Sequence, residues 1–245
     1  MRNFMLTLCY DGTRYNGWQK QGNTENTIQH KLETLLSRLL SQEVEIAASG
    51  RTDAGVHARR QVCSFKAETE LDCETLLADI RKYLPEDIGA ISLSEAGPRF
   101  HARLNCKGKT YVYRVRISEV PDVFGRKYVY KYNKPLDIAA MRSAAEKLCG
   151  EHDFSAFTSA KRMKKSAVRC ISAIDISEEN GEVRFSLTGN GFLYNMVRII
   201  VGTLLEVGAG KRDTESVESA LSSRDKKNAG FTAPAQGLIL WDVFY

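Results

Sequence analysis

The feature that most constrains the fold is an order of predicted elements that occurs twice along the 245-residue chain. In the first half, alternating apolar residues predict strands, and leucines spaced three and four residues apart predict a helix. Asn26 and Gln29 have the pattern of a capping box at the start of that helix. The predicted elements are a strand at 4–10, a helix at 26–39, strands at 44–46 and 62–65, a helix at 72–84 and a strand at 88–93. Their order is β-α-β-β-α-β.

The second half repeats this order after a long alternating strand at the junction. Its predicted elements are strands at 110–117 and 128–132, a helix at 137–149, strands at 171–176 and 183–187, a helix at 194–207 and a strand at 238–243. We therefore expect an α+β protein of two tandem ferredoxin-like halves, 1–104 and 105–245. Each half would be an antiparallel sheet with helices on one face. Two such sheets side by side would form a central cleft for a ligand.

Composition narrows the classes of function. No apolar run approaches the roughly 18 residues of a membrane span, and the apolar start of the chain meets Asp11 too early for a signal sequence. We therefore expect a cytoplasmic protein. The six cysteines form no C-x-x-C pair, so they predict reduced thiols rather than a zinc or redox site. A net charge of +5 favours a polyanionic partner, although many proteins with this charge bind none.

One loop, ASGRTDAGVHA at 48–58, presents a single carboxylate, Asp53. The simpler interpretation is a turn residue that accepts hydrogen bonds from nearby backbone N–H groups. A catalytic interpretation is favoured by Arg51 two residues earlier and by the glycines at 50 and 55, which make the backbone adaptable. The loop also follows a predicted strand, where catalytic groups are often mounted.

A second charged residue stands out in NGFLYNMVRIIVGTLLEVG at 190–208. Arg198 is the only charged residue between Leu193 and Glu206. A guanidinium on so apolar a helix must either extend to solvent or meet an acid, because an unpaired buried charge is very costly. Asp53 is a candidate acid. Such a pair would keep the carboxylate ionised and oriented, as a nucleophile or base requires.

Tyr111 and Tyr113 alternate with Arg114 and Arg116, so the two rings share one face of a strand. Tyrosines there are usually core residues, but one ring stacking on a nucleobase is the alternative. Basic residues nearby are Arg99, His101, Arg103, Lys107 and Lys109, and a second group is KRMKK at 161–165 with Arg169. Each group is either a solvated face or a contact for phosphates.

Several of these stretches together match one family. GRTDAGVHA, FHAR at 100–103, KTYVYR at 109–114, NMVRIIVG at 195–202 and GLIL at 237–240 resemble the tRNA pseudouridine synthase A family in order and distance, as does YDGTRYNGWQ at 10–19. The resemblance extends over nearly the whole chain.

The resemblance implies roles for individual residues. Asp53 would be the catalytic nucleophile, Arg51 would flip or hold the target, and Arg198 would pair with the aspartate. Tyr111 would stack on the target base. Further substrate contacts are expected at His57, Arg103 and Lys109, beside an apolar patch from GLIL.

The resemblance also implies the reaction: isomerisation of uridine to pseudouridine at positions 38, 39 and 40 of the tRNA anticodon stem-loop. The expected protein is a homodimer with tRNA lying across both subunits, and it needs no cofactor, metal, DNA or membrane. The carboxylate would either attack C1′ or remove a proton from C2′ to give a glycal-like intermediate; the residues do not choose between these routes.

Three other functions are alternatives to the isomerisation of uridine in tRNA. The same chemistry on ribosomal RNA fits the catalytic motifs equally, and a non-catalytic RNA-binding protein is a rival of another class. A metal-dependent nuclease is disfavoured because no second acid lies near Asp53 in the sequence.

Overall fold

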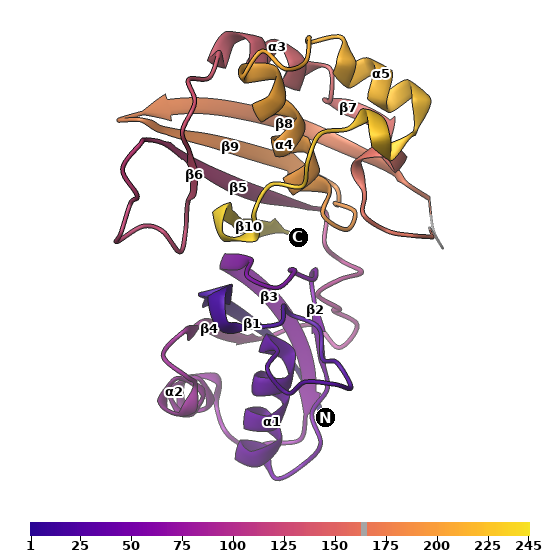
Figure 1. Ribbon diagram of the computed structural model, residues 1–245. Helices are drawn as coiled ribbons and strands as arrows, with labels where there is room; N and C mark the ends of the chain where they lie inside the picture. The colour runs from indigo at the N-terminus through magenta and orange to yellow at the C-terminus, as the bar shows by residue number, and fades with distance from the viewer. Residues whose placement is uncertain (163–165) are drawn as a thin grey trace. The chain divides into compact units, whose positions relative to one another are not determined.

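The computed structural model describes residues 1–162 and 166–245, and it divides into two compact units (Figure 1). Unit 1 comprises Met1–Lys107 together with Leu240–Tyr245, and unit 2 comprises Gly108–Ile239. Both mix helices with mostly antiparallel strands, so the expected α+β class is confirmed. No described helix is both long and apolar enough to cross a membrane.

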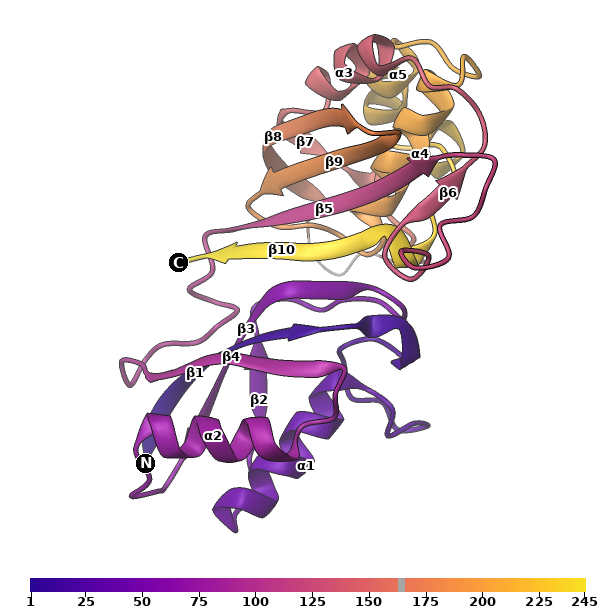
Figure 2. The same cartoon turned by 90° about the vertical axis from the view of Figure 1, so that its left-hand side faces the viewer.

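Unit 1 has the elements that the first half of the sequence predicts. They are β1 (Arg2–Tyr10), the short 3-10 helix η1 (Gly12–Arg14), α1 (Ile28–Leu40), β2 (Ile46–Ala48), β3 (His57–Ala67), α2 (Cys73–Tyr83) and β4 (Ile88–Glu95). The strand β1 lies between β4 and β3, and β2 pairs with β3; all these pairs are antiparallel. Both helices lie on the same face of the strands (Figure 2).

The core of unit 1 follows from the alternation along β1. Phe4, Leu6 and Leu8 are fully buried, and the ring of Phe4 stacks on Phe65 of β3 with 5.1 Å between centroids. The stripe of leucines on α1 covers these side chains, and Leu32 and Leu36 are also fully buried. Pairing with β1 on one side sets the register of β3 beneath the helices, with a shift between Leu8 and Tyr10.

The predicted capping box at Asn26 is wrong by one residue. Thr27 is the N-cap of α1, and its hydroxyl accepts from the backbone N–H of His30 at 3.3 Å. Asn26 instead donates through its side chain to the carbonyl of Arg14. Both residues are good caps, and the tertiary contact to Arg14 decides between them.

Unit 2 contains more elements than predicted. They are β5 (Gly108–Ile117), β6 (Tyr130–Tyr132), α3 (Ile138–Glu146), β7 (Gly150–Asp153), η2 (Ser155–Phe157), β8 (Val168–Glu179), β9 (Glu182–Gly189), α4 (Met196–Gly208), α5 (Ser216–Ser223), η3 (Lys226–Asn228), η4 (Ala235–Gly237) and the start of β10 (Leu238–Phe244). The strand order is β5-β9-β8-β7, and these neighbours are antiparallel. The helices α3 and α4 pack on each other and against the strands.

Two features of unit 2 depart from the expected second β-α-β-β-α-β half. The short strand β6 runs parallel to β5. The connection 118–129 leads the chain back beside Val115, so that Tyr130–Tyr132 pairs with 115–117 in the same direction. β7 and α5 were not predicted: β7 is a mostly polar four-residue edge strand, and α5 is eight residues long. Segments this short carry little periodic signal, and they form where neighbouring elements supply partners.

The last residues of the chain pack against residues of unit 1. Trp241 lies under the guanidinium of Arg59, and Asp242 forms an ion pair with Arg60 at 3.2 Å. The Tyr245 hydroxyl donates to the carbonyl of Ala102 at 2.8 Å. Residues 240–245 therefore belong to unit 1.

Candidate active site

The Asp53 loop is held at its start by a buried glutamine. Gln61 of β3 is fully buried, accepts from the Ser49 hydroxyl at 2.6 Å and donates to the carbonyl of Gly50 at 2.9 Å. The Ser49 backbone N–H also donates to Val62 at 2.8 Å. The chain therefore leaves β2 in a defined direction before it reaches Arg51 and Asp53.

The middle of the loop is held by the segment that follows β1. The carbonyl of Thr52 accepts from the N–H of Trp18 at 3.0 Å, and the Thr52 hydroxyl lies 2.8 Å from that of Tyr10. Burial raises the pKa of Tyr10 well above its ordinary value, so its phenol stays protonated and available for this bond. Thr52 is buried, whereas Asp53 is half-buried. The loop backbone is therefore fixed, and Asp53 keeps part of its surface exposed to solvent.

The end of the loop is packed against Gly12. A Cβ at Gly12 would lie 2.0 Å from the carbonyl oxygen of Val56, so no other residue fits without moving the loop. The N–H of Gly12 donates to Nδ1 of His57 at 3.0 Å. This bond requires the neutral ring with its hydrogen on Nε2. Asp11 Oδ1 lies 3.2 Å from the same nitrogen, and it forms an ion pair only if the ring is protonated and the Gly12 bond is lost.

His57 was expected to contact substrate, but only 2% of it is exposed. Its contacts with Gly12 and Asp11 join β3 to the segment after β1. This burial and these contacts favour a positioning role for His57 over direct contact with substrate. Arg51 is exposed on the same loop, and Arg103 is exposed in the connection after β4.

The stretch YDGTRYNGWQ thus has a structural role beside the Asp53 loop. Sequence reasoning used it only as part of a resemblance and did not predict Tyr10, Trp18 or Gln61 as supports. The two glycines in the stretch were the available signal, because they permit close approach of two backbones.

In unit 2, Lys109 and Tyr111 lie on β5. Tyr111 is 8% exposed, and its ring meets Phe192 edge-on with 5.2 Å between centroids. Tyr113, on the same face, is fully buried and donates to the carbonyl of Pro234 at 2.7 Å. Of the two tyrosines, Tyr111 alone keeps exposed surface with which to meet a base.

Arg198 is half-buried near the start of α4. Its Nε donates to the carbonyl of Ala233 at 2.6 Å and its Nη1 to the side chain of Asn195 at 2.8 Å. Asn195 is the N-cap of α4 with φ of 60°, a left-handed conformation that asparagine tolerates. The Arg198 side chain therefore has a defined direction. Its pairing with Asp53 joins residues of the two units and stays a prediction.

Two other expectations concern metals and phosphates. Among the described residues, no three His, Cys, Asp or Glu side chains are grouped as metal ligands. Residues 163–165 of the basic stretch KRMKK lie outside the described part of the chain. Arg169 is half-buried and bonds the carbonyls of Ser166 and Val168, at 2.9 and 2.6 Å.

Comparison with known proteins identifies the family. The profile of tRNA pseudouridine synthase matches residues 8–105 and 144–245. The chain belongs to the tRNA pseudouridine synthase family. It is 44% identical over 243 residues to tRNA pseudouridine synthase A 2 of Bacillus cereus, with 99% of each chain covered. It is 44% identical to tRNA pseudouridine synthase A 1 of Clostridium tetani and 45% identical to tRNA pseudouridine synthase A of Bacillus sp. strain KSM-64, with full coverage of both.

Among solved structures, a Cbf5-Nop10-Gar1 complex matches with a TM-score of 0.40 and 15% identity, over 83% of this chain and 45% of that chain. This similarity is too weak to bear on fold or function. The family assignment, in contrast, confirms the resemblance found in the sequence and the class of enzyme, because pseudouridine synthases are isomerases. Arg51, Asp53, His57, Arg103 and Arg198 lie inside the matched ranges, whereas Lys109 and Tyr111 lie in the unmatched segment 106–143.

Proposed function

We propose that this protein isomerises uridine to pseudouridine in tRNA, at positions 38, 39 and 40 of the anticodon stem-loop, with Asp53 as the essential residue. The observation that carries the proposal is the Asp53 loop. Gln61 and Trp18 donate to the backbone carbonyls of Gly50 and Thr52, and the hydroxyl of Tyr10 bonds that of Thr52, so the chain that leads to the half-buried Asp53 is fixed. A preorganised carboxylate of this kind is suited to covalent or proton-transfer chemistry.

The reaction needs no other reagent. The bond from N1 to C1′ breaks, uracil turns, and C5 bonds to C1′; the C5 proton is lost and N1 gains a proton. Asp53 would either attack C1′, forming an ester that C5 later displaces, or remove the C2′ proton to give the glycal-like intermediate. In both routes the carboxylate must be ionised at the start.

The other residues have proposed roles on the same nucleotide. Tyr111 stacks on the target base, Arg51 occupies the gap that flipping leaves, and Arg198 orients Asp53. Lys109 and Arg103 contact phosphates, and His57 holds the loop. Unstacking a base costs a few kcal/mol, which the first two contacts would offset.

The finer architecture is part of the same proposal. We infer that both units are variants of the ferredoxin-like arrangement and that 1–104 and 105–245 are the two functional halves. We further infer a cytoplasmic homodimer on which tRNA lies across both subunits, acting without metal or cofactor.

Tritium release from tRNA labelled at uridine C5 tests the reaction. The native chain should release tritium, and Asp53→Asn, which keeps the shape and removes the charge, should reduce release at least 1,000-fold with unchanged tRNA affinity. Asp72→Asn is the matched control, because Asp72 only caps α2. Release by Asp53→Asn at the native rate would overturn the role of Asp53.

Mapping of pseudouridine in cellular RNA identifies which RNA and which positions are modified. Pseudouridine forms a stable carbodiimide adduct that stops reverse transcription. Stops at 38–40 in treated tRNA support the proposal. Stops in ribosomal RNA alone would replace the substrate while keeping the chemistry, and no stops in either RNA would leave only an RNA-binding function.

A further inference from the structure

The connection between β5 and β6 exposes an apolar surface. Val120 is 72% exposed, Val123 is 57% exposed and Phe124 is 97% exposed. We name residues 118–126 the tip loop. Large apolar side chains gathered on one exposed segment usually mark a binding surface, because exposing them to water is unfavourable.

The tip loop is nevertheless ordered by its own polar contacts. The Ser118 hydroxyl donates to the carbonyl of Val120 at 2.9 Å and accepts from its N–H at 3.1 Å. Asp122 Oδ1 accepts from the N–H of Gly125 at 2.7 Å. A Cβ at Gly125 would lie 2.4 Å from Oδ2 of the same carboxylate, so a larger residue there would displace the Asp122 side chain. Arg126 donates to the carbonyl of Val123. Phe124 is therefore held outward on a formed turn.

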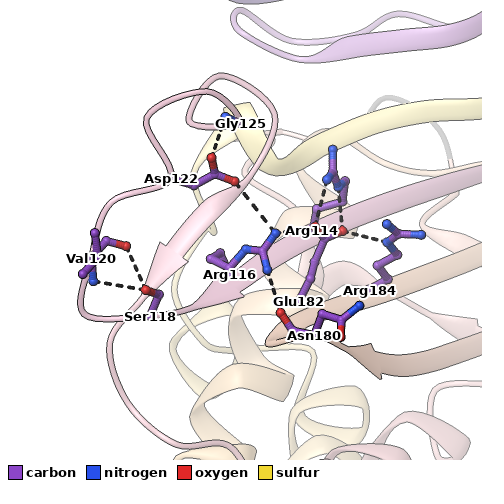
Figure 3. Close-up of polar contacts among 9 residues, drawn as sticks. All are labelled: Arg114, Arg116, Ser118, Val120, Asp122, Gly125, Asn180, Glu182 and Arg184. Carbon is purple, nitrogen blue, oxygen red and sulfur yellow. Dashed lines mark hydrogen bonds and ion pairs between the residues drawn. The ribbon is translucent and has the colours of Figure 1, made fainter.

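The base of the tip loop is tied to β5, to the start of β9 and to the turn between β8 and β9 (Figure 3). Arg116 donates to the carbonyl of Asn180 at 2.7 Å and to Glu182 at 3.4 Å, and it lies 3.9 Å from the Asp122 carboxylate. Glu182 is 5% exposed and also accepts from Arg114 and Arg184. One buried acid thus organises three arginines, and through Arg116 it reaches the turn that carries Phe124.

The charge around the ring points to a nucleic acid. Residues 118–131 contain three basic and two acidic residues, and Asp122, one of the two acids, is engaged with Arg116. Arg126 follows Phe124 closely and is exposed. An exposed ring beside cations suits an unpaired base and its phosphate. Three apolar side chains are a small patch beside the roughly 800 Å² per partner of a stable protein interface, so a second copy of the chain fits less well.

We propose that the tip loop binds the RNA substrate, with Phe124 stacked on an unpaired base and Arg126 on the adjoining phosphate. This inference rests on the proposed function and adds a substrate contact to it. The tip loop lies in the segment 106–143 that the family profile leaves unmatched.

The test compares substitutions at Phe124 in the full-length protein, with tRNA affinity measured by filter binding. Phe124→Ala should weaken binding on the order of tenfold, the loss of one base–aromatic stack. Phe124→Trp should keep native affinity, and Phe124→Leu, which is apolar but not aromatic, should resemble Phe124→Ala. Tyr83→Ala is the matched control, because Tyr83 is an exposed aromatic of unit 1, 56% exposed, and should bind normally.

Crosslinking identifies the partner directly. With p-benzoylphenylalanine in place of Phe124, irradiation should join the protein to tRNA. Crosslinking only between protein chains, or native affinity in Phe124→Ala, would overturn the inference. Tritium release by the native chain is measured in the same samples. If release occurs while Phe124 variants bind normally, only the tip-loop contact fails; if the native chain releases no tritium, the proposed function fails separately.

Discussion

At the scale of single residues, the site depends on side chains whose direction is set by backbone groups. Gln61 holds the start of the Asp53 loop, and Ala233 and Asn195 hold Arg198. Such contacts cost little when satisfied, but they leave buried polar atoms unpaired when one partner is removed. We therefore expect positioning residues to affect turnover more than affinity.

Arg198→Met tests this at one position. It removes the bonds to Ala233 and Asn195 and the positive charge, so kcat should fall at least 100-fold while tRNA affinity changes less than threefold. Single-turnover tritium release measures the first quantity and filter binding the second. Arg198→Lys keeps the charge without the forked geometry and should recover part of the rate. Native turnover in Arg198→Met would mean that Arg198 does not orient Asp53.

At the scale of elements, the β5–β9 pair places two arginines directly opposite each other. Arg114 and Arg184 are paired in register, an arrangement that is unfavourable for like charges. Glu182, two residues along β9, accepts from both and removes the conflict. Glu182 therefore supports the pairing of β5 with β9 and, through Arg116, the base of the tip loop.

Acid titration tests the contribution of Glu182. Hydrogen bonds from Arg114 lower the pKa of Glu182 from 4.5 to about 2. Because the folded-state pKa is depressed, this stability is fully present above pH 4.5 and is lost as the pH falls toward 2. Its size is on the order of 1–3 kcal/mol, because solvent screens the partly exposed arginines. Urea unfolding between pH 2.5 and 6 should show a steeper decline for the native chain than for Glu182→Gln. Equal slopes would mean that the carboxylate contributes no such stability.

At the scale of the whole molecule, the last residues of the chain return to unit 1. Contacts of Trp241, Asp242 and Tyr245 with residues 59, 60 and 102 connect the end of the chain to β3 and to the segment after β4. Burial raises the pKa of the Tyr245 hydroxyl, so it stays a donor throughout the neutral range. The end of the chain thus helps to complete the unit that carries Asp53.

Deletion of residues 241–245 should therefore destabilise unit 1 selectively. We expect a loss of about 2–4 kcal/mol from the contacts removed, seen as faster hydrogen exchange in β3 with unchanged exchange in β8 and β9. Tyr245→Phe, which removes only the bond to Ala102, should reproduce a small part of the effect. Uniform loss of protection in both units would show instead that the chain unfolds as one cooperative body.

Features encoded by neighbouring residues were predictable from the sequence, whereas features that depend on distant residues were not. The alternation at Phe4, Leu6 and Leu8 and the leucines of α1 predicted those elements, because side-chain periodicity is local and repeats along the segment. The loop motif around Asp53 led to the family for the same reason: its residues are adjacent in sequence. Features that depend on distant partners were missed, such as the burial of His57 and the edge strand β7.

The sequence by itself determined the α+β class, the family, the class of enzyme and the residues to test first. Only the tertiary structure decided that Thr27 rather than Asn26 caps α1, that β6 runs parallel to β5, and that residues 240–245 belong to unit 1. The physical reason is the same in each case. A local pattern states what a segment prefers, but the partner that satisfies its hydrogen bonds and covers its apolar face comes from elsewhere in the chain.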